Sequence, residues 1–257
     1  MRGPFLYDIL THMSNPWLTK DRSETASNRM PDRVMSNGTV VQNPALGINV
    51  YKGILSTDQC SDIIATLEEN LSGDKYYSWE GAKVTEGHEA ILEARNCLDF
   101  KIGQNCLGPE SNSNRDLYRI HQESFDAIYP HVEDYGQYWG VVMRYYEVFN
   151  YVKYQGTGQH FAVHADHGPA YVTTVSAVAY LNDNYSGGEI VFPRFGLSIK
   201  PEPGDLVVFP STFIYEHSSE PIVDGDKYSI VVMTDYNDRG GAKYFDYTKS
   251  DTSKLIY

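Results

Sequence analysis

Residues 179–210 read AYLNDNYSGGEIVFPRFGLSIKPEPGDLVVFP and alternate short apolar runs with turns rich in glycine and proline. The turns are NYSGG and PEPG, and the runs between them contain many of the β-branched and aromatic residues that favour strands. Closely spaced short strands with such turns are typical of a sandwich or jelly roll and not of a parallel sheet. The stretch therefore predicts the centre of a mainly β domain.

The strand-like pattern extends on both sides of this stretch, from about residue 141 to residue 236. Turn signals such as QGTG and VDGD continue to separate the apolar runs. Eight strands are predicted, at residues 145–154, 160–166, 171–182, 188–192, 196–200, 205–209, 213–217 and 227–236.

Two helices are predicted before these strands. Ser56 or Thr57 can cap a helix, and its apolar stripe consists of Ile63, Ile64, Leu67 and Leu71. A second stripe predicts a helix within residues 116–136. Because the helices precede the strands, the predicted fold class is α+β, mainly β: a jelly roll with N-terminal helices packed on one sheet.

The predicted domain organisation has one boundary. Residues 1–47 are expected to form an irregular N-terminal arm, because residues 14–47 are rich in Ser, Asn, Pro and Arg and show no periodicity. Residues 48–257 are expected to form a single domain, with helical support at 56–138 and the jelly roll at 141–236.

Charge and composition restrict the classes of partner. The chain has 257 residues and a net charge of −13, of which residues 1–55 carry +2 and the remainder −15. An acidic body repels polyanions, so nucleic acid and anionic membranes are not expected as partners. An arm of opposite charge could hold a neighbouring subunit, and a homo-oligomer joined through it is compatible with the sequence.

The cysteines and the N-terminus favour a cytoplasmic protein. Cys60, Cys97 and Cys106 are odd in number, scattered and not spaced for zinc, which suits reduced thiols. We find neither a signal-peptide pattern nor an apolar run as long as a membrane span.

Three histidines and one aspartate lie within eight positions of GQHFAVHADHGPAY, residues 158–171. Alternate residues of a strand share a face, so His164 and Asp166 can point to the same spot. A jelly roll brings a later strand to the same end, and His217 is the one histidine after His167. Two histidines and one carboxylate form the facial triad that holds Fe(II) in non-haem oxygenases.

A cation for an acidic co-substrate is predicted on the strand that follows. Lys227 lies at its start, and Ser229 shares its face by the period of two. A buried ammonium beside a hydroxyl would bind the far carboxylate of a 2-oxo dicarboxylate through charge-assisted hydrogen bonds.

Four segments together resemble the Fe(II)/2-oxoglutarate dioxygenases, and within them the prolyl 4-hydroxylase group. They are VKYQGTGQHFAVHAD, AYLNDNYSGGEIVFP, LSIKPEPGDLVVFP and HSSEPIVDGDK, and a fainter similarity covers residues 49–70. The resemblance implies a double-stranded β-helix, Fe(II), 2-oxoglutarate and O2, with ascorbate as a further cofactor. It also implies hydroxylation of a C–H bond, with a prolyl residue of a peptide or protein as substrate.

The resemblance also implies a role for particular residues. His164, Asp166 and His217 would be the iron ligands, and Lys227 would pair with the 5-carboxylate of 2-oxoglutarate. Tyr180 would donate to the same carboxylate, and Tyr154 would line the iron pocket. Phe161 departs from the pattern, since many members have tyrosine at this position.

Two other functions are compatible with this fold. A non-catalytic binding or assembly protein could retain it, but such a protein should have lost a ligand or the lysine, and this sequence retains them. A nucleic-acid demethylase would be expected to carry a second basic residue soon after Lys227, and YSIVVMTDYND contains none.

Overall fold

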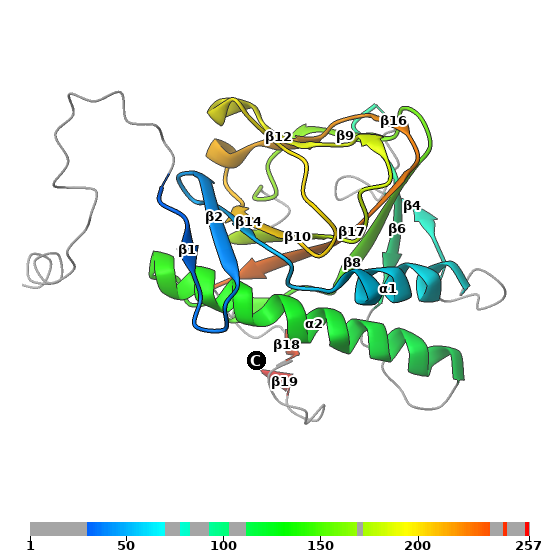
Figure 1. Cartoon of the computed structure of the whole chain (residues 1–257), viewed down its shortest axis with the longest axis horizontal. Helices are drawn as coiled ribbons and strands as arrows, with labels where there is room; N and C mark the ends of the chain where they lie inside the picture. Colours follow the sequence, from blue (N-terminus) through cyan, green and yellow to red (C-terminus); the bar gives the residue numbers. More distant parts are fainter. Residues whose placement is uncertain are drawn as a thin grey trace, which may run out of the picture.

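The computed structural model describes residues 30–69, 78–82, 93–102, 112–168, 172–236, 244–245 and 255–256. The described chain forms three layers, with two helices under a large antiparallel sheet and a smaller sheet on the other side of it (Figure 1). This is the predicted fold class, a mainly β jelly roll with its helices packed on one sheet.

The large sheet joins segments that are far apart in the sequence. Its strand order is β1-β2-β3-β14-β10-β17-β8-β6-β4, and β7 pairs with β17. Its strands are β1 (Arg33–Val34), β2 (Val40–Ala45), β3 (Ile48–Tyr51), β4 (Glu80–Gly81), β6 (Leu98–Lys101), β7 (Tyr145–Tyr146), β8 (Asn150–Gln155), β10 (Val175–Tyr180), β14 (Leu206–Pro210) and β17 (Asp226–Asp235). The central strands β14, β10 and β17 are almost wholly buried because helices cover one face and the small sheet covers the other.

The small sheet has the order β13-β12-β15-β9-β5. Its strands are β5 (Arg95–Asn96), β9 (His160–His164), β12 (Ile190–Phe192), β13 (Leu197–Ile199) and β15 (His217–Ser219). A two-stranded ribbon of β11 (Ser186–Gly187) and β16 (Ile222–Asp224) and the pair β18 (Tyr244–Phe245) and β19 (Leu255–Ile256) complete the described strands.

The helices α1 (Thr57–Glu69) and α2 (Asn112–Trp139) lie under the large sheet. Ser56 caps α1: its Oγ accepts from the Gln59 amide, and the Gln59 side chain accepts from the Ser56 amide. The predicted apolar stripe is buried at Ile63 and Leu67, in one core cluster with residues of α2 and of the sheet. Leu71, also predicted for this stripe, lies outside the described residues. Neither helix combines the length and the apolar character needed to cross a membrane, within the residues described.

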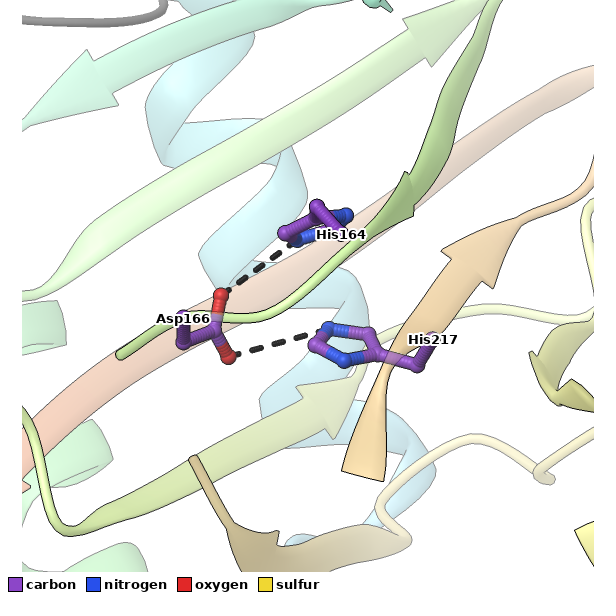
Figure 2. A group of neighbouring side chains, drawn as sticks. All are labelled: His164, Asp166 and His217. Carbon is purple, nitrogen blue, oxygen red and sulfur yellow. Dashed lines mark ion pairs between the residues drawn. The ribbon is translucent and has the colours of Figure 1, made fainter. Parts of the chain in front are cut away.

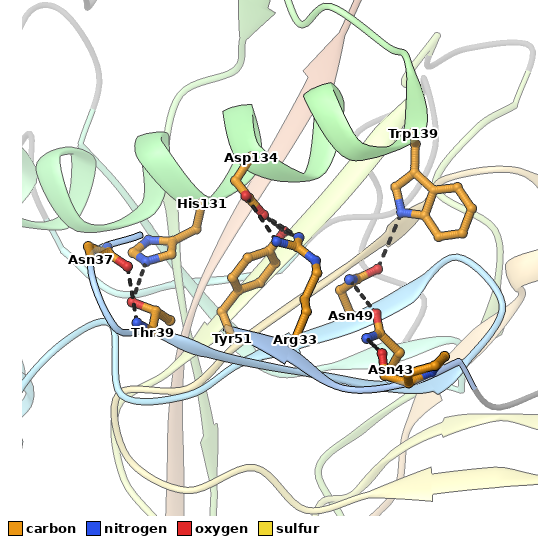
Figure 3. Close-up of polar contacts among 10 residues, drawn as sticks. Arg33, Asn37, Thr39, Asn43, Asn49, Tyr51, His131, Asp134 and Trp139 are labelled. Atoms are coloured by element: carbon orange, nitrogen blue, oxygen red, sulfur yellow. Dashed lines mark hydrogen bonds and ion pairs between the residues drawn. The ribbon is translucent and has the colours of Figure 1, made fainter. Parts of the chain in front are cut away.

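The predicted boundary at residue 47 is wrong for the part of the arm that the structure describes. β2 and β3 pair across that position, and β1 extends the same sheet. Polar contacts fix these strands to α2 (Figure 3). Arg33 forms an ion pair with Asp134, the Tyr51 hydroxyl donates to Asp134 at 2.8 Å, and the Trp139 indole donates to Asn49 at 3.3 Å. Residues 30–47 therefore belong to the domain.

Several predicted strands have different bounds. Residues 145–154 divide into β7 and β8, and residues 171–182 narrow to β10. Residues 213–215 form a short 3-10 helix (η4, Phe213–Tyr215), so β15 begins only at His217. Another 3-10 helix, η3 (Pro193–Phe195), follows β12 and lies beside η4, because the Arg194 side chain donates to the Phe213 carbonyl oxygen. η4 ends at Tyr215, just before His217, a residue of the site described below.

One glycine is required for the joint between α1 and the jelly roll. Gly204, in the PEPG turn, has φ of +86°, and a Cβ there would collide with the Leu55 carbonyl oxygen. That turn also donates and accepts backbone hydrogen bonds with Ile54 and Tyr180. A side chain at this position would push the α1 connection away from the sheet.

Candidate metal centre and anion pocket

His164, Asp166 and His217 meet at one end of the jelly roll (Figure 2). His164 ends β9, Asp166 follows two residues later, and His217 begins β15 directly opposite His164 in the sheet register. The Asp166 carboxylate lies 3.3 Å from His164 Nε2 and 3.7 Å from His217 Nε2. One donor atom from each residue lies within 4.8 Å of the other two, so a single ion can contact all three.

Backbone carbonyl groups orient both imidazole rings. His164 Nδ1 is 2.8 Å from the Ala162 carbonyl oxygen, and His217 Nδ1 is 3.2 Å from that of Tyr215. An Nδ1–H donated to a carbonyl leaves the unprotonated Nε2 free to bind a metal. Both Nε2 atoms face Asp166, as a ligand set requires.

Hydrogen bonds hold the Asp166 carboxylate in the ionised form. The Ser176 hydroxyl donates to Asp166 Oδ2 at 2.6 Å, and Ser176 Oγ lies 2.8 Å from Ser211 Oγ. Burial alone would raise the pKa of Asp166, but His217, His164 and the Ser176 hydrogen bond lower it to about 2. The carboxylate is therefore charged at neutral pH.

The His217 imidazole is neutral at neutral pH. Burial lowers its pKa to about 4, and the Phe209 and Phe192 rings lie 4.6 and 5.7 Å from its ring. Two imidazoles and one carboxylate with free Nε2 atoms fit Fe(II), which takes this ligand set and retains open positions.

Lys227 lies in a second polar pocket between the two sheets. It is buried, with 2% of its surface exposed, and its ammonium donates to the Gly188 carbonyl oxygen at 2.7 Å and to Ser219 Oγ at 2.8 Å. Burial lowers its pKa to about 7, opposed by Glu189. An ammonium has three N–H donors, and two of them have acceptors among the described residues. The third can donate to a bound ligand.

The other predicted pocket residues surround this ammonium. Tyr154 lies opposite Lys227 on β8, and Tyr180 lies opposite Ser229 on β10. The ammonium nitrogen is 4.9 Å from the Tyr154 ring centroid and 5.4 Å from that of Tyr180. Both tyrosines and Ser229 are buried. The hydroxyl that accepts from the Lys227 ammonium is that of Ser219 and not that of the predicted Ser229.

Two residues of this region were not predicted from the sequence. Tyr185 is buried, and its hydroxyl has no hydrogen-bond partner among the described residues. The Tyr185 ring edge and the Lys227 side chain both lie close to Gly188, since a Cβ added there would contact both. Tyr185 therefore lies beside the aliphatic part of Lys227. The Ser176 hydroxyl donates directly to the carboxylate of Asp166. The period of two from Tyr180 could have identified Ser176, but no sequence signal marks Tyr185.

Residues 149–234 match the family model of the 2OG-Fe(II) oxygenase superfamily. The matched stretch contains every residue predicted for the metal centre and the anion pocket. Three solved structures are similar in fold. A prolyl hydroxylase of Trichoplax adhaerens, solved with a hypoxia inducible factor peptide, has a TM-score of 0.56 at 16% identity over 73% of this chain and 83% of its own.

A Pseudomonas putida prolyl-4-hydroxylase has a TM-score of 0.54 at 21% identity over 73% of this chain and 92% of its own. A collagen prolyl hydroxylase of Paramecium Bursaria Chlorella virus-1, in complex with 2OG, has a TM-score of 0.50 at 17% identity over 73% and 95% of the two chains. The resemblance found in the sequence is confirmed at this level: residues 149–234 match the 2OG-Fe(II) oxygenase superfamily, and the fold is like that of prolyl hydroxylases.

Proposed function

We propose, starting from this 2OG-Fe(II) oxygenase segment, that the protein is a dioxygenase that hydroxylates a prolyl residue of a peptide or protein. In the overall reaction one oxygen atom of O2 enters the C–H bond as hydroxyl. The other enters succinate as 2-oxoglutarate loses CO2. The observation that carries the proposal is the convergence of His164, Asp166 and His217 on one point within 4.8 Å.

The ligand set has one negative charge and two neutral donors. His164, Asp166 and His217 would hold Fe(II), which when bound supplies the activation of dioxygen that C–H hydroxylation requires. Ser176 fixes the carboxylate orientation through its 2.6 Å hydrogen bond. Phe192 and Phe209 pack against His217 and exclude water from that side of the centre.

The anion pocket would hold the 5-carboxylate of 2-oxoglutarate. Lys227 supplies the buried cation, and the Tyr180 and Tyr154 ring centroids lie within 5.4 Å of its ammonium nitrogen. Burial makes the charged form of Lys227 unfavourable, and its low pKa reflects this. A bound carboxylate would offset that cost.

The peptide substrate and the prolyl specificity rest on the fold and on the four sequence segments. Ascorbate is included in the proposal as a reductant that sustains turnover. The cytoplasmic location expected from the cysteines is a further part of it.

The test uses the full chain, stripped of metal and reloaded anaerobically with Fe(II). Succinate is measured after addition of O2 and 2-oxoglutarate, with and without ascorbate, and with proline-containing peptides or their alanine counterparts. We expect the wild-type protein to form succinate. We also expect a proline-containing peptide, and not its alanine counterpart, to gain the mass of one oxygen atom. Succinate formation without any proline-dependent product would support the oxygenase and refute the prolyl substrate.

A further inference from the structure

Strand β9 contains an irregularity that changes which of its side chains share a face. His164 lies opposite His217, and Phe161 lies opposite Ser219, so three steps along β9 correspond to two along β15. Residues three apart in a regular strand point to opposite faces. The extra residue is a β-bulge, which turns Phe161 to the side of His164. The two rings stack, with centroids 3.5 Å apart and planes at 16°.

Arg95 contacts Phe161 from the neighbouring strand. It lies opposite Phe161 in the β5–β9 register, and its guanidinium carbon is 4.9 Å from the Phe161 ring centroid. The side chain is only 14% exposed, and an Nη2 hydrogen bond to Asp99 at 2.6 Å fixes its direction. The ion pair with Asp99 keeps the Arg95 guanidinium against the Phe161 ring, and the cation–π contact restricts the orientation of that ring.

The two histidine ligands differ in what surrounds them. His217 has 9% of its side chain exposed and is enclosed by Phe192 and Phe209, whereas His164 has 21% exposed. The hydrogen bond from His164 Nδ1 to Ala162 fixes the tautomer, but one hydrogen bond does not fix the tilt of the ring. The stack on Phe161 supplies that second constraint.

We propose that Arg95 is a positioning residue of the metal centre, which holds Phe161 flat against His164 and so keeps His164 Nε2 directed at Asp166 and His217. The inference rests on the proposed metal centre, and it assigns a purpose to the phenylalanine that departs from the family pattern. A tyrosine at position 161 would stack on His164 with the same ring. The stacking therefore depends on the aromatic ring and needs no hydroxyl.

The experiment measures Co(II) binding to the metal-stripped full-length protein by its visible absorption, which reports both affinity and ligand geometry. Replacing Arg95 alone would leave the buried Asp99 unpaired, so the comparison is between D99N and R95M/D99N. We expect D99N, whose amide oxygen can still accept a hydrogen bond from Arg95, to retain most of the Co(II) affinity. R95M/D99N should bind Co(II) about tenfold more weakly than D99N, the lower limit for loss of a partner that holds a metal ligand in place. F161L should show a similar loss, and F161Y should not.

A double-mutant cycle separates positioning from packing. If Arg95 acts through Phe161, adding R95M to F161L/D99N should change the Co(II) affinity by less than twofold, because the contact is already lost. Thermal unfolding of each metal-free variant is measured alongside. R119M, which removes an arginine ion-paired with Asp62 on the helices, is the matched control and should leave Co(II) binding unchanged.

Each result decides one claim. Unchanged Co(II) affinity and spectrum in both F161L and R95M/D99N, whatever their thermal stability, would overturn the positioning role while leaving the metal centre intact. Additive losses in the cycle would overturn the action through Phe161. Failure of the wild-type protein itself to bind Co(II) would instead refute the proposed metal centre.

Discussion

The two sheets contribute different halves of the site, and they do so in different ways. The small sheet carries the proposed metal ligands His164 and His217 on strands of five and three residues, with a register shift between the strands. The large sheet carries Lys227, Ser229, Tyr180 and Tyr154 on longer strands in unbroken register. The metal ligands are therefore positioned by an irregularity and by carbonyl hydrogen bonds, and the anion pocket by regular alternation.

This difference predicts how each half should respond to change. The metal centre depends on a few short-range contacts around three side chains, so we expect removal of one of them to abolish metal binding and turnover. The pocket half is built into the central sheet, where a single side chain can be removed and its neighbours stay in place. The following changes test that contrast, from the largest expected effect to the smallest.

Asp166→Ala should abolish turnover. It should also weaken metal binding by more than roughly 10- to 100-fold, which is the usual loss when only a residue that hydrogen-bonds to a ligand is replaced. The two remaining neutral imidazoles would leave the charge of Fe(II) uncompensated. Metal affinity and succinate release are measured together, with Asp183→Ala, outside both halves of the site, as the matched control. Near-normal succinate release from Asp166→Ala would refute the ligand assignment.

Lys227→Met should weaken 2-oxoglutarate binding by about 30- to several-thousand-fold, from the roughly 2–5 kcal/mol of a truncated buried charge pair. Metal affinity should change little, because the ammonium contacts Gly188 and Ser219 and not a ligand. Binding of 2-oxoglutarate to the Co(II)-loaded protein is measured by calorimetry. The control is Lys101→Met, at an exposed lysine on β6. An unchanged 2-oxoglutarate affinity in Lys227→Met would show that another cation binds the carboxylate.

Tyr180→Phe removes one hydroxyl and retains the ring. If that hydroxyl donates to the carboxylate, its loss costs roughly 1.5–3 kcal/mol, or about 10- to 150-fold in 2-oxoglutarate affinity. The control is the thermal stability of the protein without co-substrate, which should not change. A lowered stability with unchanged affinity would identify Tyr180 as a core residue only.

Binding of 2-oxoglutarate should also depend on pH through Lys227. Its pKa is about 7 in the free protein, where Tyr154, Tyr180, Glu189, Cys97 and Lys200 surround it, and a bound carboxylate would raise that pKa. The complex then holds more protons than the free protein above pH 7, so affinity should fall as pH rises, by at most about tenfold per unit. Calorimetry in buffers of different ionisation enthalpy should show proton uptake at pH 8, and Lys227→Met should show none.

The sequence alone was sufficient for the residues that follow the period of two. Alternation along a strand predicted that His164 and Asp166, and likewise Lys227 and Ser229, would share a face. The donor atoms of His164 and Asp166 do converge, although β9 ends at His164 and Asp166 follows it, and Lys227 and Ser229 lie two positions apart on β17. The late histidine was found because His217 is the one histidine after His167. The two helices were predicted because their apolar stripes are long and strongly periodic.

Three features needed the tertiary structure. The bulge that turns Phe161 onto His164 depends on pairing with β15, and the partner Arg95 lies 66 positions before Phe161 in the chain numbering. The hairpin across residue 47 forms because its strands bury apolar side chains in the core and β3 pairs with β14, while polar side chains bind α2. The Ser, Asn, Pro and Arg content of residues 14–47 hid the short strands β1 and β2. The local periodicity of the sequence indicates which face of a strand a side chain is on. Register shifts and contacts between distant strands depend on how the whole sheet packs. Those shifts and contacts determine the geometry of the site, so only the tertiary structure gives it.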